Sequence, residues 1–538
     1  MVRWNDGERT GSDGGRGRAL SRRGVLGAGL AAGVGVAAGS WAAAGASAAP
    51  PASVPAPRAA GAPRPGDWTA LGRGLDGTLV RPGSRDYDAA RKLFNPRFDG
   101  LRPAAVAYCA RPEDVRTCLE FAKRHQVPVA VRSGGHSYAG WSSGPGLVVD
   151  VQRMAGVSLS GTTATIGAGA KLIDVYDRLT ARGRTVPAGS CPTVGVSGLA
   201  LGGGIGVVSR AYGLTSDSVV GARIVTADGR IRTVDATHDP DLFWALRGGG
   251  NAQFGVVTEL RMRTHAAPRC TTFFLSWPWS RAAAVVREWQ KWAPTAPDGI
   301  WANLHLSAPV GGRPGSVRVG GLALTSRGDL ENRLDRLADA VGAPARSVSV
   351  RTRPFMDAMK VMGGVSGFTI AQSHQKGTLP GTNPQGRVAR ESYAARSDFY
   401  TKRIPADGIK ALLDRVQRLA ALTGGGAGSI ALDALGGAVG RVDPTATAFV
   451  HRDALFLAQY IVSWPDRASA TTVARHQAWL DGTHAVMRPW ASGRAYQNYT
   501  DPKLRDWRRA YFGANAERLA RIKKTYDPGR MFRHPQAF

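Results

Sequence analysis

The chain has 538 residues, enough for two or three domains, and its 43% hydrophobic and 20% charged residues are ordinary for a globular protein. The formal net charge is +30, but the arginines that carry most of it are scattered and no basic block alternates with aromatic residues, which argues against a nucleic-acid partner. Four cysteines are too few for a disulfide scaffold and lack the spacing of metal ligands. Cys109 and Cys118 either pair or are separate buried thiols.

The N-terminus has the order of an export signal. Arg22 and Arg23 form a twin-arginine pair, an apolar run rich in Gly and Ala follows, and Ala46-Ser47-Ala48 offers a cleavage site. A membrane anchor is the alternative, but Gly and Ala insert weakly, and no other segment is long and apolar enough to span a bilayer. We therefore expect a Tat-type signal peptide over 1–48, a Pro/Ala-rich linker over 49–67, and a secreted or extracytoplasmic protein without a stable membrane anchor after cleavage.

Between residues 68 and 267, short apolar runs alternate with helical patterns. The expected strands span 104–109, 127–131, 146–151 and 163–168, and the expected helices span 113–125, 171–182 and 241–246. Asp228-Gly229 predicts a hairpin between strands at 219–226 and 231–234, and a closing strand begins at 254. This recurrence predicts an α+β fold with a mixed sheet. No G-x-G-x-x-G joins the first strand to a helix, which disfavours a Rossmann NAD site.

Two glycine-rich loops in this region carry one nucleophilic side chain each. One runs from Arg132 to Tyr138 and contains His136; the other runs from Gly189 to Gly198 and contains Cys191, with a further glycine run up to Gly206. Glycine lets backbone approach a ligand closely, and successive free N–H groups form a nest suited to a pyrophosphate. Either loop alone is common, and such a cysteine is usually a buried small hydrophobe. The two loops in this order and spacing are much more specific.

The paired loops resemble those of the berberine-bridge-enzyme-like flavin oxidoreductases, within the vanillyl-alcohol-oxidase (PCMH-type) superfamily. In that family R-S-G-G-H-x-Y supplies a histidine bonded to the flavin 8α-methyl carbon, and G-x-C-P-x-V-G-x-x-G supplies a cysteine bonded to C6. The resemblance implies an FAD-binding PCMH-type domain over 68–267 and covalent FAD. The cofactor-binding residues that it implies are Arg132, Ser133, Gly134, Gly135, His136, Ser137, Cys191, Val194, Gly195, Gly198, Gly202, Gly206, Gly255, Val257 and Asn498. No metal is expected.

Residues 268–490 have the pattern of a substrate-binding domain, an antiparallel sheet covered by helices. The expected strands span 271–277, 301–306, 317–324, 429–435 and 454–462, and the expected helices span 282–292, 329–341 and 409–422. Leu330, Leu334, Leu337 and Ala340 are expected to face inward. The resemblance implies that 429–437 and 447–452 form strands under the flavin ring, with Asp433 as a candidate catalytic residue. For Asp433 and His451 the preferred explanation is a satisfied polar group of a turn or core.

Residues 491–538 form a berberine-bridge-like C-terminal segment. It contains Tyr496-Gln497-Asn498-Tyr499-Thr500-Asp501 and ends in a Y-D-P-x-x-x-F run, both of which match the family's signature for a chain end that returns to the flavin domain. Strand alternation puts Tyr496 and Asn498 on one face and Tyr499 on the other. The resemblance implies Tyr496 as the general base and Asn498 as a flavin contact, with Tyr499 as the second candidate. A base role requires the phenol pKa, ordinarily about 10, to be lowered.

These features predict an exported FAD-dependent oxidase that takes hydride from an alcohol carbon of a sugar, oligosaccharide or natural product. The flavin is expected to be bonded to His136 and Cys191 and to be reoxidised by O₂, giving H₂O₂. The alternatives are a dehydrogenase with another electron acceptor and a secreted flavin-binding protein without significant turnover. The expected partners are a small-molecule substrate and O₂; the sequence leaves the oligomeric state open.

Overall fold

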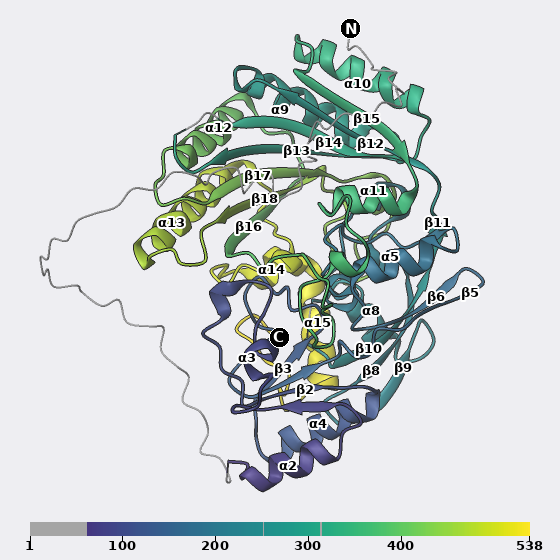
Figure 1. The fold of residues 1–538 in the computed structure, drawn as a ribbon. Helices are drawn as coiled ribbons and strands as arrows, with labels where there is room; N and C mark the ends of the chain where they lie inside the picture. The colour runs from purple at the N-terminus through teal and green to yellow at the C-terminus, as the bar shows by residue number, and fades with distance from the viewer. Residues whose placement is uncertain (1–61, 251, 313–314) are drawn as a thin grey trace, which may run out of the picture.

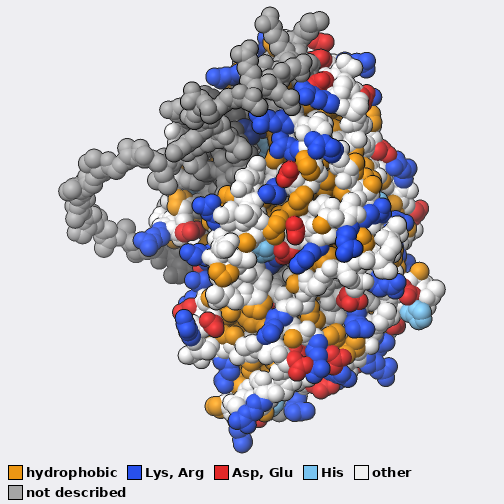
Figure 2. Space-filling model, turned by 45° about the vertical axis from the view of Figure 1, so that its right-hand side comes forward, with side chains coloured by type: hydrophobic (Ala, Val, Ile, Leu, Met, Phe, Trp, Pro, Cys, Tyr) orange, Lys and Arg blue, Asp and Glu red, His pale blue; other side chains and the backbone are white. Residues whose placement is uncertain are grey.

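The computed structural model describes residues 62–250, 252–312 and 315–538 (Figure 1). The predicted signal peptide and most of the predicted linker lie outside them. One half of the molecule is a seven-stranded sheet with helices on its outer side, and the other half holds the smaller sheets. None of the helices in the described ranges is long and apolar enough for a membrane span. On the face in Figure 2, Lys and Arg side chains are spread among acidic and apolar ones rather than gathered in one patch.

A four-stranded mixed sheet, ordered β1-β2-β4-β3, leads into the first glycine loop. Its strands are β1 (Thr78–Val80), β2 (Ala105–Tyr108), β3 (Val129–Arg132) and β4 (Leu147–Asp150). β2 and β3 both run parallel to β4, and α4 (Pro112–Arg124) makes the crossover that a parallel arrangement needs. The buried Arg132–Asp150 ion pair joins the ends of β3 and β4. The loop that carries His136 therefore starts at the carboxyl end of a firmly anchored strand.

A five-stranded antiparallel sheet, ordered β5-β6-β10-β8-β9, lies beside it. Its strands are β5 (Val157–Ser160), β6 (Thr163–Gly167), β8 (Val219–Val225), β9 (Ile231–Val234) and β10 (Val256–Arg263). The predicted Asp-Gly hairpin is confirmed as β8–β9. Two helices flank the second glycine loop, α5 (Leu172–Thr180) before it and α6 (Val196–Leu201) at its end. A short pair, β7 (Arg184–Thr185) with β11 (His265–Ala266), completes this half.

The larger sheet is antiparallel throughout and has the order β15-β12-β14-β13-β17-β18-β16. Its strands are β12 (Cys270–Trp277), β13 (Ile300–Pro309), β14 (Ser316–Ala323), β15 (Ser347–Arg353), β16 (Tyr393–Tyr400), β17 (Ala427–Ala434) and β18 (Phe456–Ser463). Four helices cover one face: α9 (Ala282–Trp292), α10 (Arg327–Val341), α12 (Ala406–Ala420) and α13 (Ala470–Met487) (Figure 1). Apolar side chains of this face pack in one core with those helices. Because side chains alternate along a strand, every second residue faces the other way.

The C-terminal segment returns to the half with the smaller sheets, as predicted. Helices α14 (Trp507–Phe512) and α15 (Ala516–Tyr526) share its hydrophobic core, and α15 packs against α8 (Pro240–Leu246). The terminal Y-D-P-x-x-x-F motif is explained by a turn. The Asp527 carboxylate accepts hydrogen bonds from the backbone N–H groups of Met531 and Phe532, and Lys523 forms an ion pair with it.

One buried arginine links the two halves. Arg210, on α7 (Ser209–Tyr212) just after the second glycine run, donates to the carbonyls of Pro294 at 2.9 Å and Ile300 at 3.0 Å. It also donates to the carbonyls of Ala296 and Leu435. All four acceptors belong to the half built on the larger sheet, so one side chain fixes that sheet against the loop region.

Three local predictions are wrong. Ala340 is exposed, because the buried stripe of α10 runs through Ala338 and Val341 instead. Residues 447–452 form no strand. The Asn515 amide donates to carbonyls of this segment and Arg452 forms an ion pair with Asp217, so side-chain contacts hold the segment in place of backbone hydrogen bonds to a neighbouring strand. Tyr496–Tyr499 is not a strand either, since residues 497–499 form a 3₁₀ turn.

The structure also answers the question about the cysteine pair. Cys109, after β2, and Cys118, on α4, are both fully buried, with 4.0 Å between their sulfur atoms. They are free thiols rather than a disulfide. The hydrogen bond with the Cys118 thiol, together with burial, raises the pKa of Cys109, which keeps it protonated and unreactive.

Candidate active site

A cavity of about 470 Å³ lies between the two glycine loops, the large sheet and the C-terminal segment. Sixteen of the eighteen predicted site residues line it: Ser133, Gly134, Gly135, His136, Ser137, Cys191, Val194, Gly195, Gly198, Gly206, Gly255, Val257, Asp433, Tyr496, Asn498 and Tyr499. The structure thus brings together residues from widely separated parts of the chain.

Arg132 and Gly202 do not line the cavity. The Arg132 side chain is buried against Asp150, where it holds the strand beneath the first loop. A Cβ on Gly202 would lie 2.0 Å from Oδ1 of Asn498, so the glycine leaves room for that side chain. In the structure these two residues support residues that face the cavity, and their contact with the cofactor stays a prediction.

The two loops touch each other through their glycines. A Cβ on Gly134 would lie 2.2 Å from the backbone nitrogen of Gly195, and a Cβ on Gly195 would lie 2.1 Å from Oγ of Ser133. The hydroxyls of Ser133 and Ser197, one near each loop, both donate to the carbonyl of Ala168, at 2.7 and 2.8 Å. The glycines are thus needed for contact between the loops, and this contact fixes where His136 and Cys191 stand.

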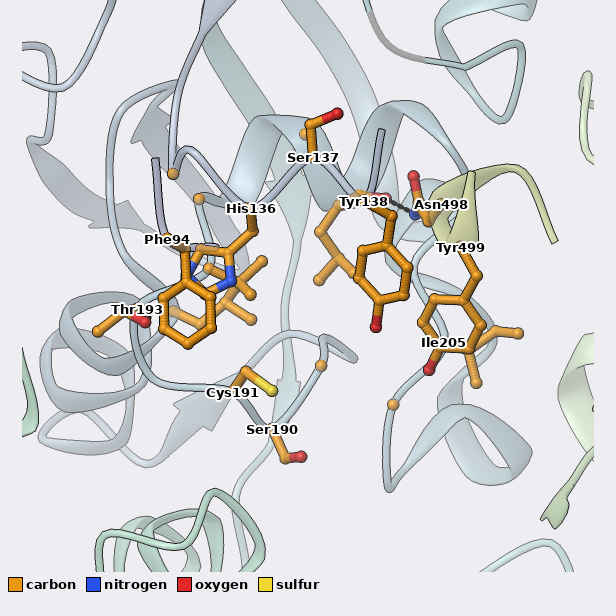
Figure 3. Close-up of a pocket in the computed structure, with 18 of the residues that line it drawn as sticks. Phe94, His136, Ser137, Tyr138, Ser190, Cys191, Thr193, Ile205, Asn498 and Tyr499 are labelled. Carbon is orange, nitrogen blue, oxygen red and sulfur yellow. Dashed lines mark hydrogen bonds between the residues drawn. The ribbon is translucent and has the colours of Figure 1, made fainter. Parts of the chain in front are cut away.

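His136 is held by both loops. Its Nε2 lies 3.0 Å from Oγ1 of Thr193, and its ring stacks on Phe94 with 4.0 Å between centroids (Figure 3). Burial, together with the positive charge of Lys171, lowers the pKa of His136 to about 3. The imidazole is therefore neutral at physiological pH and keeps a lone pair for bonding.

Cys191 and two stacked tyrosines face the same space. Figure 3 shows His136 and Cys191 on one side and the rings of Tyr138 and Tyr499 on the other. The two tyrosine rings stack with 5.1 Å between centroids and a 14° interplanar angle. The Gln459 amide, from β18, donates to the Tyr138 hydroxyl at 2.8 Å. Nucleophiles and ionisable phenols therefore flank one space.

The Tyr496 hydroxyl is hydrogen-bonded to the backbone. It accepts hydrogen bonds from the N–H groups of Gly204 at 3.0 Å and Ile205 at 3.2 Å, and from the Asn498 amide at 2.9 Å. Tyr496 and Asn498 do meet, as expected, but through a 3₁₀ turn. Burial raises the pKa of Tyr496 despite these three donors. A base role required a lowered pKa, so these surroundings oppose it.

The cavity's opposite wall is the helix-free face of the large sheet, and this face is polar. Sequence reasoning found only Asp433 there. It missed Asn303, His305, Ser307, Arg318, Ser429 and Gln459, which all line the cavity. The signal was present: three polar residues alternate with apolar ones along β13, a pattern that marks a polar face on an otherwise buried strand. Asn303 and His305 are joined by a hydrogen bond of 2.9 Å.

The lining fits a large ligand with many hydrogen-bonding groups. Ser142 Oγ, Trp301 Nε1, Gln497 Oε1 and Gln536 Oε1 belong to lining residues and are buried without a hydrogen-bond partner within the described ranges. Buried polar atoms are normally paired, because leaving them unpaired costs free energy. In the same residue ranges, no group of three or more His, Cys, Asp and Glu residues is suited to a metal ion. The donor set suits a dinucleotide such as FAD.

An FAD-binding oxidoreductase is the class of protein that this arrangement defines, and comparisons with known proteins agree. Residues 103–235 match the family model described as "FAD binding domain". Residues 495–537 match the model described as "Berberine and berberine like". The first match falls within the predicted flavin domain and the second within the predicted C-terminal segment, whose limits remain predictions.

Relatives extend the match to most of the chain. An uncharacterised FAD-linked oxidoreductase of Bacillus subtilis, YgaK, is 32% identical over 470 residues, which cover 86% of this chain and 97% of the relative. A chitooligosaccharide oxidase of Gibberella zeae is 30% identical over 481 residues, covering 85% and 91%. The solved structure of Physcomitrella patens BBE-like 1 has a TM-score of 0.78 at 27% identity and covers 88% of this chain and 98% of that one. The chain belongs to the berberine-bridge-enzyme-like FAD-linked oxidoreductases, and its predicted α+β fold is confirmed.

Proposed function

We propose that the protein is an exported oxidase that carries FAD bonded to both His136 and Cys191. It oxidises an alcohol carbon of a sugar or oligosaccharide and uses O₂ as the electron acceptor, giving H₂O₂. The observation that carries this proposal is that both nucleophilic side chains face one cavity from loops in backbone contact. The similarity to a protein named chitooligosaccharide oxidase supports the choice of substrate.

The chain's own groups suit covalent attachment. His136 is neutral, and because Nε2 is next to Thr193, Nδ1 is the ring nitrogen left to form a bond. Cys191 supplies the second bond from the neighbouring loop. When bound, FAD supplies the hydride acceptor that no side chain provides. Two bonds keep the cofactor with the protein after export, because outside the cytoplasm no free FAD would be available to replace a lost cofactor.

We assign the proton acceptor to Tyr499 rather than Tyr496. Tyr499 lines the cavity, is only partly buried, and stacks on Tyr138. Tyr496, whose oxygen already accepts three hydrogen bonds, positions the backbone at Gly204 and Ile205. The polar sheet face opposite, with Asp433 and Gln459, suits the hydroxyl groups of a sugar, and the nearby aromatic rings suit its apolar faces.

The attachment is tested by acid denaturation followed by separation from small molecules. Yellow colour is expected to stay with the wild-type chain and, in part, with His136→Ala and with Cys191→Ala. The double variant should release all its flavin. Release of free flavin from the wild type would contradict the proposal.

The reaction is tested with a sugar panel under air and under argon. An oxidase gives peroxide in air and bleaches its flavin under argon. A dehydrogenase reduces an added dye without peroxide, and a flavin-binding protein shows neither reaction. Tyr499→Phe should lower kcat by roughly 10²–10⁴-fold with flavin attachment intact. A comparable loss in Tyr496→Phe alone would return the base role to Tyr496.

Export is tested by replacing both arginines of the N-terminal pair. Arg22→Lys combined with Arg23→Lys should leave folded precursor in the cytoplasm. Undiminished secretion of this variant would contradict the Tat route.

A further inference from the structure

Arg318 places a cation on the substrate side of the cavity. It lies on β14 opposite His305 of β13, and both residues line the cavity. The row continues through Ala431 of β17 to Gln459 of β18. Gln459 in turn binds Tyr138, which stacks on Tyr499. Arg318 and the proposed proton acceptor therefore occupy opposite ends of one row of side chains.

The Arg318 charge is not neutralised by any residue that the structure describes. Among residues 62–250, 252–312 and 315–538, no carboxylate forms an ion pair with Arg318 and no group forms a hydrogen bond with its side chain. Partial burial lowers its pKa, and no neighbouring charge contributes to that shift. An arginine remains protonated under all physiological conditions. A partly dehydrated guanidinium without a partner favours an oxyanion, because its planar fork forms paired hydrogen bonds with one.

Other cations of the protein show what Arg318 lacks. Arg452, Arg396 and Arg132 are also withdrawn from solvent, and each has an aspartate partner. The acidic residues of the cavity lining, Asp433 and Glu391, both have interactions of their own. Unlike these three arginines, Arg318 has no ion-pair partner among the residues that the structure describes, and it lines the cavity.

The strand order sets the backbone separation between Arg318 and Gln459. β14 and β18 are separated by three strand spacings, roughly 14 Å in total. That span is longer than a single sugar ring. A substrate oxidised beside Tyr499 therefore reaches Arg318 only with a later sugar unit.

We propose that Arg318 is a subsite for an oxyanion, a carboxylate or phosphate, on a unit of the substrate beyond the one that is oxidised. The substrate class is then an acidic oligosaccharide rather than a neutral one. This inference rests on the proposed function, because it takes the oxidised unit to lie at Tyr138 and Tyr499.

The test uses the flavin-loaded enzyme and disaccharides that share a reducing glucose. These are cellobiose, glucuronosyl-β-1,4-glucose and cellobiose 6′-phosphate, with the corresponding trisaccharides. The wild type should oxidise one or both acidic forms with a lower KM than the neutral form, and the preferred acid identifies the oxyanion. Arg318→Gln should raise the KM for that acid roughly 10- to 100-fold with little change in kcat or in the KM for the neutral sugar. Arg318→Lys should lose less, because it keeps the charge.

The matched control is Arg351→Gln, an exposed arginine outside the cavity on β15, which is separated from β14 by β12. It should change neither KM. The monosaccharides glucose and glucuronate serve as an internal control, since a single unit is too short to reach Arg318. Equal losses for neutral and acidic oligosaccharides in Arg318→Gln, or no loss at all, would overturn the inference and leave the proposed function intact.

A second measurement separates the two proposals. Binding of each disaccharide is followed under argon by the change in flavin absorbance. If acidic forms bind in an Arg318-dependent way but no sugar reduces the flavin, the subsite stands and the oxidase proposal fails. If binding shows no dependence on Arg318, the subsite fails whatever the enzyme oxidises.

Discussion

Adding one methyl group at Gly195 should separate the two glycine loops. Gly195 has φ −77° and ψ 134°, which alanine adopts without strain, so the effect comes only from space. The new carbon would lie 2.1 Å from Ser133 Oγ and 2.4 Å from the Gly134 nitrogen, whereas ordinary contact begins at 3.4 Å. Since the Gly134 nitrogen is backbone, the loops must move apart by about 1 Å. Such overpacking costs about 1–3 kcal/mol of stability.

The larger effect of Gly195→Ala should fall on flavin attachment. His136 is two residues from Gly134, and Cys191 is four residues from Gly195, so a shift between the loops changes the position of one nucleophile relative to the other. A displacement of 1 Å lowers the rate of an orientation-dependent reaction by about 10²-fold. Covalent flavin is measured by fluorescence of the denatured chain on a gel, after timed addition of FAD to apoprotein.

The matched control is Gly144→Ala, because a Cβ there has no atom within 4 Å. It should attach flavin at the wild-type rate and melt at the wild-type temperature. Equal attachment rates and equal stability in Gly195→Ala and Gly144→Ala would refute the argument that loop contact positions the nucleophiles.

Three further predictions follow from buried groups. With the cysteine removed, flavin attachment to His136 should be as fast at pH 5 as at pH 8, because its pKa is about 3; a histidine with the ordinary value would react about 30-fold more slowly at pH 5. Arg210→Met should lower the free energy of unfolding in urea by about 3 kcal/mol because it leaves buried carbonyls unpaired, whereas Arg441→Met, at an exposed ion pair, should cost less than about 1 kcal/mol. Burial lowers the pKa of His374, but the hydrogen bond and charge of Asp174 raise it above its usual value. The His374–Asp174 pair therefore stabilises the folded protein below a pH of about 6.5, and this stabilisation is lost as the pH rises through the raised pKa of His374. Asp174→Asn should remove this pH dependence, which melting curves at pH 5.5 and 9 would detect.

Most of the fold could be predicted because local signals agreed with tertiary structure. The helix over 282–292 matches α9 in both limits, and the Asp-Gly turn gave the β8–β9 hairpin. Helix α13 was missed because its buried face contains His476, Thr483 and His484 at helical spacing, so a search for apolar residues does not detect it. Strand β16 was missed because it is buried on both faces and shows no alternation.

The candidate site was predictable where chemistry resides in a contiguous motif. The two loops gave His136 and Cys191 directly. The ion pair between Arg132 and Asp150 was not predictable, because the sequence alone does not distinguish an arginine that contacts a ligand from one that binds an aspartate of the next strand. The Tyr496 assignment assumed a strand, and only the fold reveals that its hydroxyl binds Gly204 and Ile205.

The alternation along β13 separates residues that determine what the cavity binds from residues that determine stability. Leu304 and Leu306 pack under the helices, while Asn303, His305 and Ser307 face the cavity. A substitution at Asn303, His305 or Ser307 therefore alters what the cavity can bind without opening a void in the core under the helices. A substitution at Leu304 or Leu306 changes stability and leaves the cavity lining unchanged. A lineage built on this sheet can acquire new substrates by single steps that cost little folding free energy, which makes the wall a permissive surface for evolutionary divergence and for directed evolution.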